Sequence, residues 1–293
     1  METAVEEALR DALGAPVTVQ ALRGVGGGCI NEAAVVDTDA GAFFVKWNRH
    51  PIPDQFDREA ESLTALRAAN TELIVPQPLV WRRSDGATPA FLILEYLPPG
   101  SPVAEFDVRL GRGLAALHRN TAPQFGFAHD NYCGTSPQPN PWTGDWVSFY
   151  RDHRLRHQVS LASEARGMSA VDRATYDRLL DRLDELLGSD PEPSALLHGD
   201  LWSGNLHVAP DGQPALIDPA AYYGHREAEL GMMNLFGGFS QRVWSVYDEA
   251  FALQPGWRDR LPLYELYHLL NHYTLFGGGY GSQALAIARR YVG

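Results

Sequence analysis

The sequence predicts an α+β protein with two lobes: a small N-terminal antiparallel β-sheet lobe with one helix, and a larger, mainly helical C-terminal lobe. Short alternating or apolar segments, separated by turn sequences, dominate the first part of the chain. Pro98-Pro99-Gly100 interrupts this pattern, and beyond it apolar residues recur mostly at helical spacing. We expect the lobes to cover residues 1–95 and 96–293.

Five strands and one helix are expected in the first lobe. The strands are expected at Val17–Leu22, Ala33–Asp37, Ala42–Trp47, Leu79–Arg83 and Ala90–Tyr96. Asp39-Ala40-Gly41 and Ser84-Asp85-Gly86 are turn sequences between strands. Asp54 can cap a helix that runs to about Ala68.

The second lobe is expected to be helical, with one irregular stretch. Helices are expected at Asp107–Arg119, at Trp146–Leu161 and from the capping sequence at Ser169 to Leu187. Two short strands, Leu206–Ala209 and Ala215–Ile217, follow the irregular stretch, and three or four helices complete the chain.

Composition excludes several classes of protein. The chain has 293 residues, 45% hydrophobic and 20% charged, as in an ordinary globular protein. Its net charge of −12 argues against a nucleic-acid partner. Two cysteines cannot form a disulfide framework or a four-ligand zinc site. Neither a signal peptide nor a membrane span is recognisable, so we expect a cytoplasmic protein without a membrane partner.

Lys46 is the only lysine among 24 basic side chains, and it ends an apolar strand. A lysine that points inward from such a sheet can reach the phosphates of ATP. On the expected helix, Glu59 shares a face with Phe56 and Leu63, and a carboxylate on an apolar face usually needs a partner. We therefore expect a Lys46–Glu59 ion pair; the alternative is two separate surface residues.

A glycine-rich turn lies between the first two expected strands, with the sequence Gly26-Gly27-Gly28-Cys29-Ile30-Asn31. Such a turn lets backbone N–H groups approach a triphosphate closely. The same sequence is also typical of a bulge or a flexible turn.

The irregular stretch His198–Asn205 has the residue types of a phosphoryl-transfer loop. Asp200 can accept the proton of a hydroxyl, and Asn205 can supply an amide oxygen to a divalent ion. Asp218 follows the next strands, as the metal-binding aspartate does in kinases. The order of these parts, more than any one of them, points to a kinase.

The chain resembles the fructosamine/ketosamine-3-kinase family, in the aminoglycoside-phosphotransferase branch of the protein-kinase-like fold. The resemblance covers nearly the whole chain. It is carried by the sequences at 26–31, 44–46, 142–156, 196–205, 218–220, 223–227 and 236–239. Trp-Ser-Gly-Asn at 202–205, and Asp-Pro-Ala at 218–220 with Tyr-Gly-His at 223–225, are the most specific of these.

The resemblance implies ATP and Mg²⁺ as cofactors and a role for each matched residue. Lys46, paired with Glu59, contacts the phosphates, Asp200 is the catalytic base or orients the hydroxyl, and Asn205 and Asp218 hold magnesium. The remaining nucleotide contacts implied are Gly26, Gly27, Gly28, Cys29, Asn31, Glu95 and Leu97, the last two through backbone groups at adenine.

The implied acceptor is the 3-hydroxyl of a fructosamine or ribulosamine, as a small molecule or on a protein. The product then decomposes, so the implied role is deglycation. Trp202 can face the sugar or a substrate ammonium, or it can pack the loop. His225 can contact the substrate or support the loop, and support is the role we favour. His118 is interpreted as a structural helix residue.

Cys29 lies among N–H groups that lower the pKa of a thiol. If exposed, it can be oxidised or pair with Cys29 of a second chain, so the sequence leaves open a monomer or a redox-sensitive homodimer. Burial of Cys29 as a small apolar residue is the alternative.

Two other functions remain open from sequence. One is a kinase for another small hydroxyl compound, such as an aminoglycoside or choline. The other is a nucleotide-binding pseudokinase without turnover, which the presence of all four catalytic positions disfavours. A protein-kinase role is disfavoured because no Ala-Pro-Glu-bounded activation loop follows Asp218.

Overall fold

The computed structural model describes residues 1–26, 31–50, 52–188 and 192–292, and the chain forms two compact units. One unit comprises Met1–Phe106 with Leu206–Pro219, and the other comprises Asp107–Asn205 with Ala220–Gly293. These units differ from the contiguous ranges 1–95 and 96–293, because segments beyond residue 95 pack with the N-terminal part. The Gly100 N–H donates to the Val208 carbonyl at 2.9 Å, for example. The functional division into a nucleotide lobe and a substrate lobe remains a prediction.

The first unit contains the antiparallel five-stranded sheet that the sequence predicts, in the order β1-β2-β3-β5-β4. Its strands are β1 (Val19–Val25), β2 (Glu32–Thr38), β3 (Gly41–Asn48), β4 (Pro78–Arg82) and β5 (Ala90–Glu95). Its helices are α1 (Glu2–Leu13) and α2 (Gln55–Ala68), and the small hairpin is β10 (Leu206–Val208) with β11 (Pro214–Leu216).

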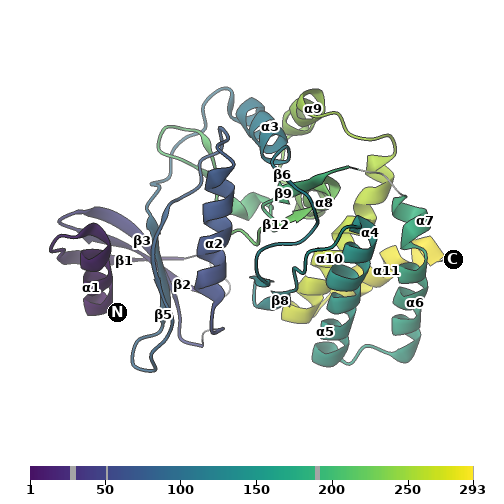
Figure 1. Ribbon diagram of the computed structural model, residues 1–293, viewed down its shortest axis with the longest axis horizontal. Helices are drawn as coiled ribbons and strands as arrows, with labels where there is room; N and C mark the ends of the chain where they lie inside the picture. Colours follow the sequence, from purple (N-terminus) through teal and green to yellow (C-terminus); the bar gives the residue numbers. More distant parts are fainter. Residues whose placement is uncertain (27–30, 51, 189–191, 293) are drawn as a thin grey trace. The chain divides into compact units, whose positions relative to one another are not determined.

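Helices α1 and α2 cover opposite faces of this sheet (Figure 1). Side chains alternate between the faces of a strand. Val45 of β3 therefore packs in the apolar cluster with Val5 and Leu9 of α1, whereas the next residue, Lys46, contacts Glu59 of α2. The alternation of a single strand thus separates the core of the unit from its polar site.

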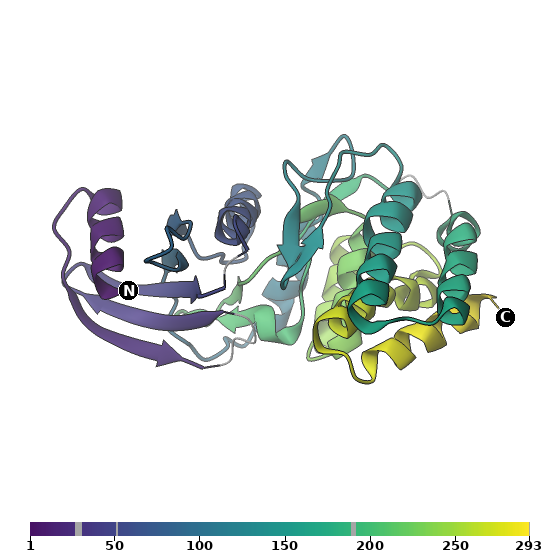
Figure 2. The ribbon, with the colours of Figure 1, turned by 90° about the horizontal axis from the view of Figure 1, so that it is seen from below.

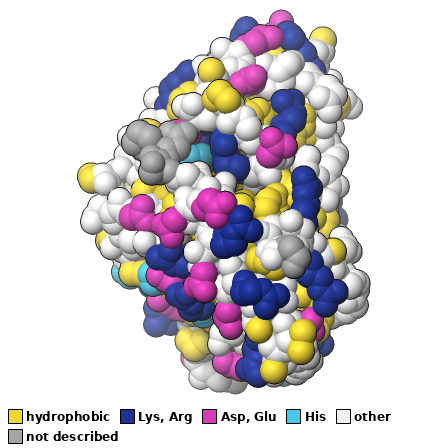
Figure 3. Space-filling view, turned by 90° about the vertical axis from the view of Figure 1, so that its right-hand side faces the viewer, with side chains coloured by type: hydrophobic (Ala, Val, Ile, Leu, Met, Phe, Trp, Pro, Cys, Tyr) yellow, Lys and Arg dark blue, Asp and Glu magenta, His cyan; other side chains and the backbone are white. Residues whose placement is uncertain are grey.

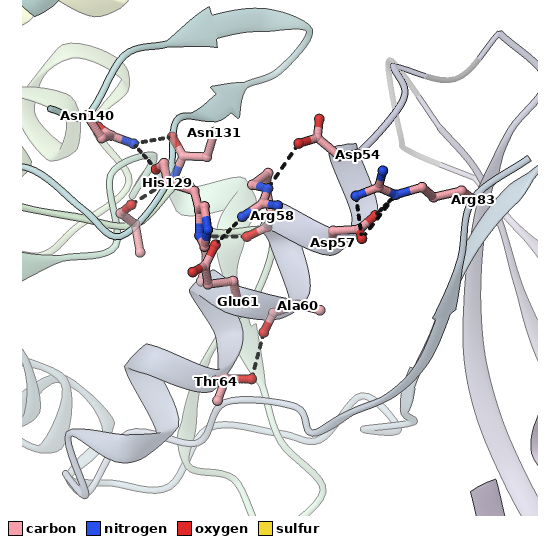
Figure 4. Close-up of polar contacts among 12 residues, drawn as sticks. Asp54, Asp57, Arg58, Ala60, Glu61, Thr64, Arg83, His129, Asn131 and Asn140 are labelled. Carbon is pink, nitrogen blue, oxygen red and sulfur yellow. Dashed lines mark hydrogen bonds and ion pairs between the residues drawn. The ribbon is translucent and has the colours of Figure 1, made fainter.

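Ion pairs hold α2 at its N-terminal end (Figure 4). Arg58 pairs with Asp54 at 3.1 Å and with Glu61 at 2.8 Å, within the first turns of the helix. Arg83, just beyond β4, pairs with Asp57 of α2 at 3.0 Å. The Arg83–Asp57 pair ties the helix that carries Glu59 to the sheet that carries Lys46, whereas the two Arg58 pairs lie within the start of the helix.

The second unit is mainly helical. Its helices are α3 (Phe106–Leu117), α4 (Trp146–Tyr150), α5 (His157–Arg166), α6 (Ala170–Asp181), α7 (Leu183–Leu187), α8 (Arg226–Phe236), α9 (Gln241–Ala250), α10 (Trp257–Phe276) and α11 (Tyr280–Val292). Helix α10 packs against α5, α8 and α11. In Figure 2 the yellow α11 lies along the outside of the teal helices of this unit.

Short strands in the second unit support the loops. Strand β9 (Ser194–Leu197) lies between β12 (Tyr222–Gly224) and β6 (Thr121–Ala122). A second hairpin pairs β7 (Asn131–Cys133) with β8 (Ser136–Gln138). The sequence pattern did not indicate these segments, because each has only two to four residues.

The helix expected at Trp146–Leu161 is instead three segments, because a π-helical turn at Arg151–Arg156 separates α4 from α5. The irregular turn carries a buried cation: the Arg154 guanidinium lies over the rings of Phe149, at 4.6 Å, and Tyr222, at 4.0 Å. A single π-helical turn within an α-helix is frequently found at functional sites. The helix expected to reach Leu187 is likewise divided, into α6 and α7.

No helix in the described parts of the chain combines the length and the apolar character needed to cross a bilayer.

Candidate functional site

Lys46 is the centre of the polar cluster in the first unit. Its Nζ donates to Oε1 of Glu59 at 2.7 Å and to Oδ1 of Asp218 at 2.9 Å. The predicted ion pair between Lys46 and Glu59 is therefore present. Asp218 joins it from the segment after β11, 172 positions along the chain from Lys46.

The lysine is buried and remains charged. Burial lowers the pKa of the Lys46 ammonium, but the carboxylates of Asp218 and Glu59 outweigh burial and hold that pKa above its ordinary value. Burial raises the pKa of the Glu59 carboxyl, and the ammonium opposes that shift. A charged lysine between two carboxylates is suited to binding phosphate oxygens.

Asp218 has a left-handed backbone, with φ of 57°, which is uncommon outside glycine. Its side chain is 48% exposed, so one carboxylate oxygen contacts Lys46 while the group still faces solvent. Aspartate tolerates this conformation better than most residues. Backbone strain of this kind is concentrated at functional positions.

The loop at residues 198–205 belongs to the second unit and follows the fully buried strand β9. Its backbone is anchored by Glu229 of α8, which accepts from the His198 N–H at 2.5 Å and from the Gly199 N–H at 3.1 Å. Burial raises the pKa of Glu229, but His118, His198 and the His198 N–H outweigh burial and lower it overall. A buried carboxylate thus fixes the start of the loop.

Gly199 cannot be replaced without moving this loop. Its φ is 84°, and a Cβ at this position would lie 2.0 Å from the carbonyl oxygen of Ala220. The neighbouring Ala220 N–H donates to the His198 carbonyl at 2.9 Å. The close approach of these two segments therefore requires glycine.

Asp200 and Asn205 contact each other within the loop. The Asn205 amide nitrogen donates to the Asp200 backbone carbonyl at 2.8 Å and to Oδ2 of Asp200 at 3.2 Å. Because the amide nitrogen is held in this way, the Asn205 carbonyl oxygen is turned away from Asp200. The arrangement fixes the Asn205 carbonyl oxygen, a possible metal ligand, next to the Asp200 carboxylate.

The two expected substrate residues are placed differently. Trp202 is 39% exposed and meets Phe236 edge to face, with ring centroids 6.2 Å apart. His225 is buried, caps α8 by accepting from the Glu227 N–H at 3.2 Å, and stacks on Tyr264. His225 thus lies buried at the start of α8, and its role, support of the loop or contact with substrate, remains a prediction.

The expected adenine contacts, Glu95 and Leu97, have some backbone groups already engaged. The Glu95 N–H donates to the Gln77 carbonyl at 2.9 Å, and the Leu97 carbonyl accepts from Nε2 of His207 at 3.0 Å. The backbone groups left to bind adenine are therefore the Glu95 carbonyl and the Leu97 N–H. Adenine binding by these two groups remains a prediction.

The glycine-rich turn is described only in part. Gly26 is exposed at the end of β1, and Oδ1 of Asn31 accepts from Asn48 of β3 at 3.1 Å. Gly27, Gly28 and Cys29 lie outside the described residues. The expectation of a redox-sensitive dimer through Cys29 stays a prediction.

Glu229 is a functional candidate that the sequence reasoning missed, whereas the position of His118 agrees with the structural role expected for it. His118 is buried, with Nδ1 2.7 Å from the Tyr247 hydroxyl and Nε2 3.8 Å from Glu229. A signal for Glu229 was available, because it lies on a helix between apolar residues, as Glu59 does. Its partners are backbone groups, however, which no side-chain motif reveals.

The predicted site residues therefore form two sets, one in each unit. Lys46, Glu59 and Asp218 contact one another in the first, and Asp200 contacts Asn205 in the second. The chain passes from one unit to the other directly after Asn205 and directly after Pro219. Asn205 and Asp218, the expected metal ligands, thus lie at or next to the positions where the chain changes unit.

Comparison with known proteins gives consistent matches. Residues 1–292 match the family model described as fructosamine kinase. A chloroplastic protein-ribulosamine 3-kinase of Oryza sativa subsp. indica is 42% identical over 288 residues, covering 95% of this chain and 81% of the relative. A crystal structure from Thermobifida fusca, named provisionally as a fructosamine-3-kinase, has a TM-score of 0.86 at 34% identity and covers 98% of this chain and 97% of that one.

A more distant structural likeness concerns the fold alone. A mutant aminoglycoside phosphotransferase APH(4)-Ia, in a ternary complex with AMP-PNP and hygromycin B, has a TM-score of 0.63 at 18% identity. The match covers 99% of each chain. It confirms the two-lobed, kinase-like α+β fold that the sequence predicts.

Proposed function

This chain belongs to the fructosamine kinase family and is an ATP-dependent phosphotransferase, and we propose that it phosphorylates the 3-hydroxyl of a ketosamine. The observation that carries the proposal is the Asp200–Asn205 contact beside the exposed Trp202. It combines a hydroxyl-orienting carboxylate, an oxygen donor and an aromatic face on one loop.

Nucleotide binding is assigned mainly to the first unit. Lys46 would contact the phosphates, and its two carboxylate partners keep it extended and charged. The Glu95 carbonyl and the Leu97 N–H would bind adenine. Backbone N–H groups of the turn from Gly26 to Asn31 would cover the phosphates.

The proposed magnesium ligands, Asn205 and Asp218, fit a hard cation. Both supply oxygen, which Mg²⁺ prefers. The Asn205 amide nitrogen is engaged with Asp200, which leaves its carbonyl oxygen as the donor, and the Asp218 side chain is half-exposed. Magnesium, when bound, neutralises charge on the transferred phosphoryl group.

Asp200 would orient the acceptor hydroxyl and take its proton. Two contacts limit the motion of the Asp200 carboxylate. Glu229 accepts a hydrogen bond from the loop backbone, and the Asn205 amide donates to Asp200 itself. Such positioning supplies much of the rate enhancement in phosphoryl transfer. The face of Trp202 suits the C–H surface of a sugar or a substrate ammonium.

The choice of ketosamine over other acceptors rests on the family relationship. An aminoglycoside or choline would use the same loop, and a pseudokinase would keep the fold without turnover. We propose a fructosamine or ribulosamine, small or protein-bound, with deglycation as the consequence and the cytoplasm as the place of action. The rice relative is named as acting on protein-bound ribulosamines.

The test is magnesium-dependent ADP release with synthetic ribulosamine and fructosamine derivatives of lysine, beside an aminoglycoside and choline. We expect turnover with the ketosamines, and a loss of about 10²–10⁴ in rate for Asp200→Asn. Asp177→Asn, an exposed carboxylate on α6, is the matched control. Turnover with choline or the aminoglycoside alone would discard the ketosamine assignment, and no turnover despite ATP binding would favour the pseudokinase.

A further inference from the structure

Three side chains of different chemistry converge in the second unit. They are Cys133 at the end of β7, Asp200 in the loop, and His268 in α10. The cysteine sulfur, a carboxylate oxygen and a ring nitrogen all lie within 4.8 Å of one another. Cys133 and His268 are buried, whereas the Asp200 side chain is 22% exposed, so the cluster is reached from the Asp200 side.

The hydrogen-bonding capacity of one ring nitrogen of His268 is unsatisfied within the described residues. Its Nδ1 is buried, has no hydrogen-bond partner among the residues that the structure describes, and lies 3.9 Å from Oδ1 of Asp200. An unsatisfied buried nitrogen is costly unless something binds it. Burial lowers the pKa of His268 to about 3, so the ring is neutral near pH 7, the form that binds metals.

Asn271, three residues further along α10, orients the sulfur. Its amide nitrogen donates to Sγ of Cys133 and to the Cys133 carbonyl, each at 3.2 Å. An N–H directed at a sulfur stabilises a thiolate, and such outer contacts commonly hold metal ligands in place. Helix α10 thus supplies His268, holds Cys133 through Asn271, and places the histidine ring near the Asp200 carboxylate.

We propose that Cys133, Asp200 and His268 bind a thiophilic divalent cation, with Zn²⁺ as the best fit. A sulfur, an imidazole nitrogen and a carboxylate together suit Zn²⁺, whereas Mg²⁺ prefers oxygen ligands only. Three protein ligands leave the fourth position to water, as in open zinc sites. Bonds of about 2.0–2.3 Å require these side chains to draw together slightly.

Binding involves no oxidation. The Cys133 thiol, whose pKa burial raises well above its ordinary value, gives its proton to solvent as the sulfur–metal bond forms. Asp200 then contributes its carboxylate to the ion. Because Asp200 is the proposed hydroxyl-orienting group, an ion here inhibits phosphoryl transfer; this consequence rests on the proposed function.

The site itself is tested by direct binding, without any activity assay. The probe is Co²⁺, with Zn²⁺ as competitor, in a Cys29→Ser background where Cys133 is the only thiol. We expect a thiolate-to-Co²⁺ charge-transfer absorption at one ion per chain. Cys133→Ser should abolish this band, and His268→Gln should weaken affinity by about 100-fold or more.

His50→Gln, an exposed histidine in the first unit, is the matched control and should leave affinity unchanged. Circular dichroism establishes that each variant is folded; if Cys133→Ser is not, His268→Gln makes the same comparison. No charge-transfer band, or equal affinity in His268→Gln and the control, overturns the site.

Inhibition is measured separately, with buffered Zn²⁺ at saturating Mg–ATP and each variant normalised to its own zinc-free rate. We expect His268→Gln to require about 100-fold more Zn²⁺ for half-inhibition. An ion that binds in the first experiment without slowing turnover would count against the role of Asp200 and leave the site standing. Equal inhibition of both proteins would overturn the inhibitory role.

Discussion

The carboxylate of Glu229 accepts the backbone N–H of His198 at 2.5 Å, so a buried helix residue holds the loop that carries Asp200. The same carboxylate accepts the N–H of Gly199 at 3.1 Å. A loop held through its backbone keeps its shape whatever its side chains bind. Glu229 is therefore a positioning residue for the proposed chemistry.

Glu229→Gln should lower kcat by about 10–100-fold. The glutamine amide has one acceptor oxygen where the carboxylate has two, so the two loop N–H groups lose part of their anchor and the loop shifts. KM for ATP should change little, since within the described parts of the chain Glu229 bonds to the loop backbone and not to a residue assigned to the nucleotide. Steady-state kinetics checks this, with Glu249→Gln, an exposed α9 residue, as control. A rise in KM for ATP at constant kcat would contradict the positioning role.

Lys46→Met should destabilise the protein by about 3–5 kcal/mol, because it leaves the buried Glu59 carboxylate without its cation. It should also abolish tight ATP binding. The control is Arg23→Met, which removes the cation of an exposed ion pair with Asp37 in the same sheet and should leave stability almost unchanged, because solvent screens such a pair. Urea unfolding and nucleotide titration check both; similar costs for the two variants would disprove the special position of Lys46.

Gly199→Ala should be far more harmful than Gly86→Ala, although both glycines have positive φ, 84° and 89°. Alanine at either position costs about 1–2 kcal/mol of backbone strain. Only at Gly199 does the Cβ meet another atom, the Ala220 carbonyl oxygen at 2.0 Å, whereas nothing lies within 4 Å at Gly86. Thermal unfolding should show a further loss of about 1–3 kcal/mol and reduced turnover for Gly199→Ala alone. Equal melting temperatures would show that the loop can move aside.

His225 should make the protein less stable in mild acid. Burial lowers its pKa below 6.5, outweighing Glu227 and Glu192, while Arg226 and Arg260 lower it further. As pH falls below 6.5, the unfolded chain therefore binds a proton that the folded chain resists, and stability declines.

His225→Asn keeps a residue that can cap α8 but removes this titration, so stability should depend less on pH below 6.5. The slope is the measurement, because loss of the ring stack on Tyr264 lowers stability at every pH. His50→Asn, an exposed histidine, should leave the slope unchanged. An equal slope in wild type and His225→Asn would remove His225 from the explanation.

The sequence predicts Lys46 and Glu59 as partners because each lies in a regular pattern, one in a strand and one on a helix face. Regular alternation determines direction, so a side chain on β3 can be assigned to a face of the sheet. The contact of Asp218 with Lys46 joins segments far apart in sequence, which no local pattern specifies.

The cluster of Cys133, Asp200 and His268 could not be predicted for the same reason. It depends on the packing of a three-residue strand against a long helix, and the strand is too short for a recognisable pattern. Likewise, the inward turn of Arg154 depends on a π-helical turn that an amphipathic pattern does not reveal.

The solitary buried lysine has a consequence for the chemistry of the protein's own surface. Every basic residue other than Lys46 is arginine, so the dark-blue groups on the face in Figure 3 are guanidiniums. Reducing sugars and other amine-seeking reagents thus find no exposed lysine side chain on this sequence, because the Lys46 amine is shielded between two carboxylates. An enzyme proposed to act on sugar-modified lysines thus has no exposed lysine side chain of its own to be modified.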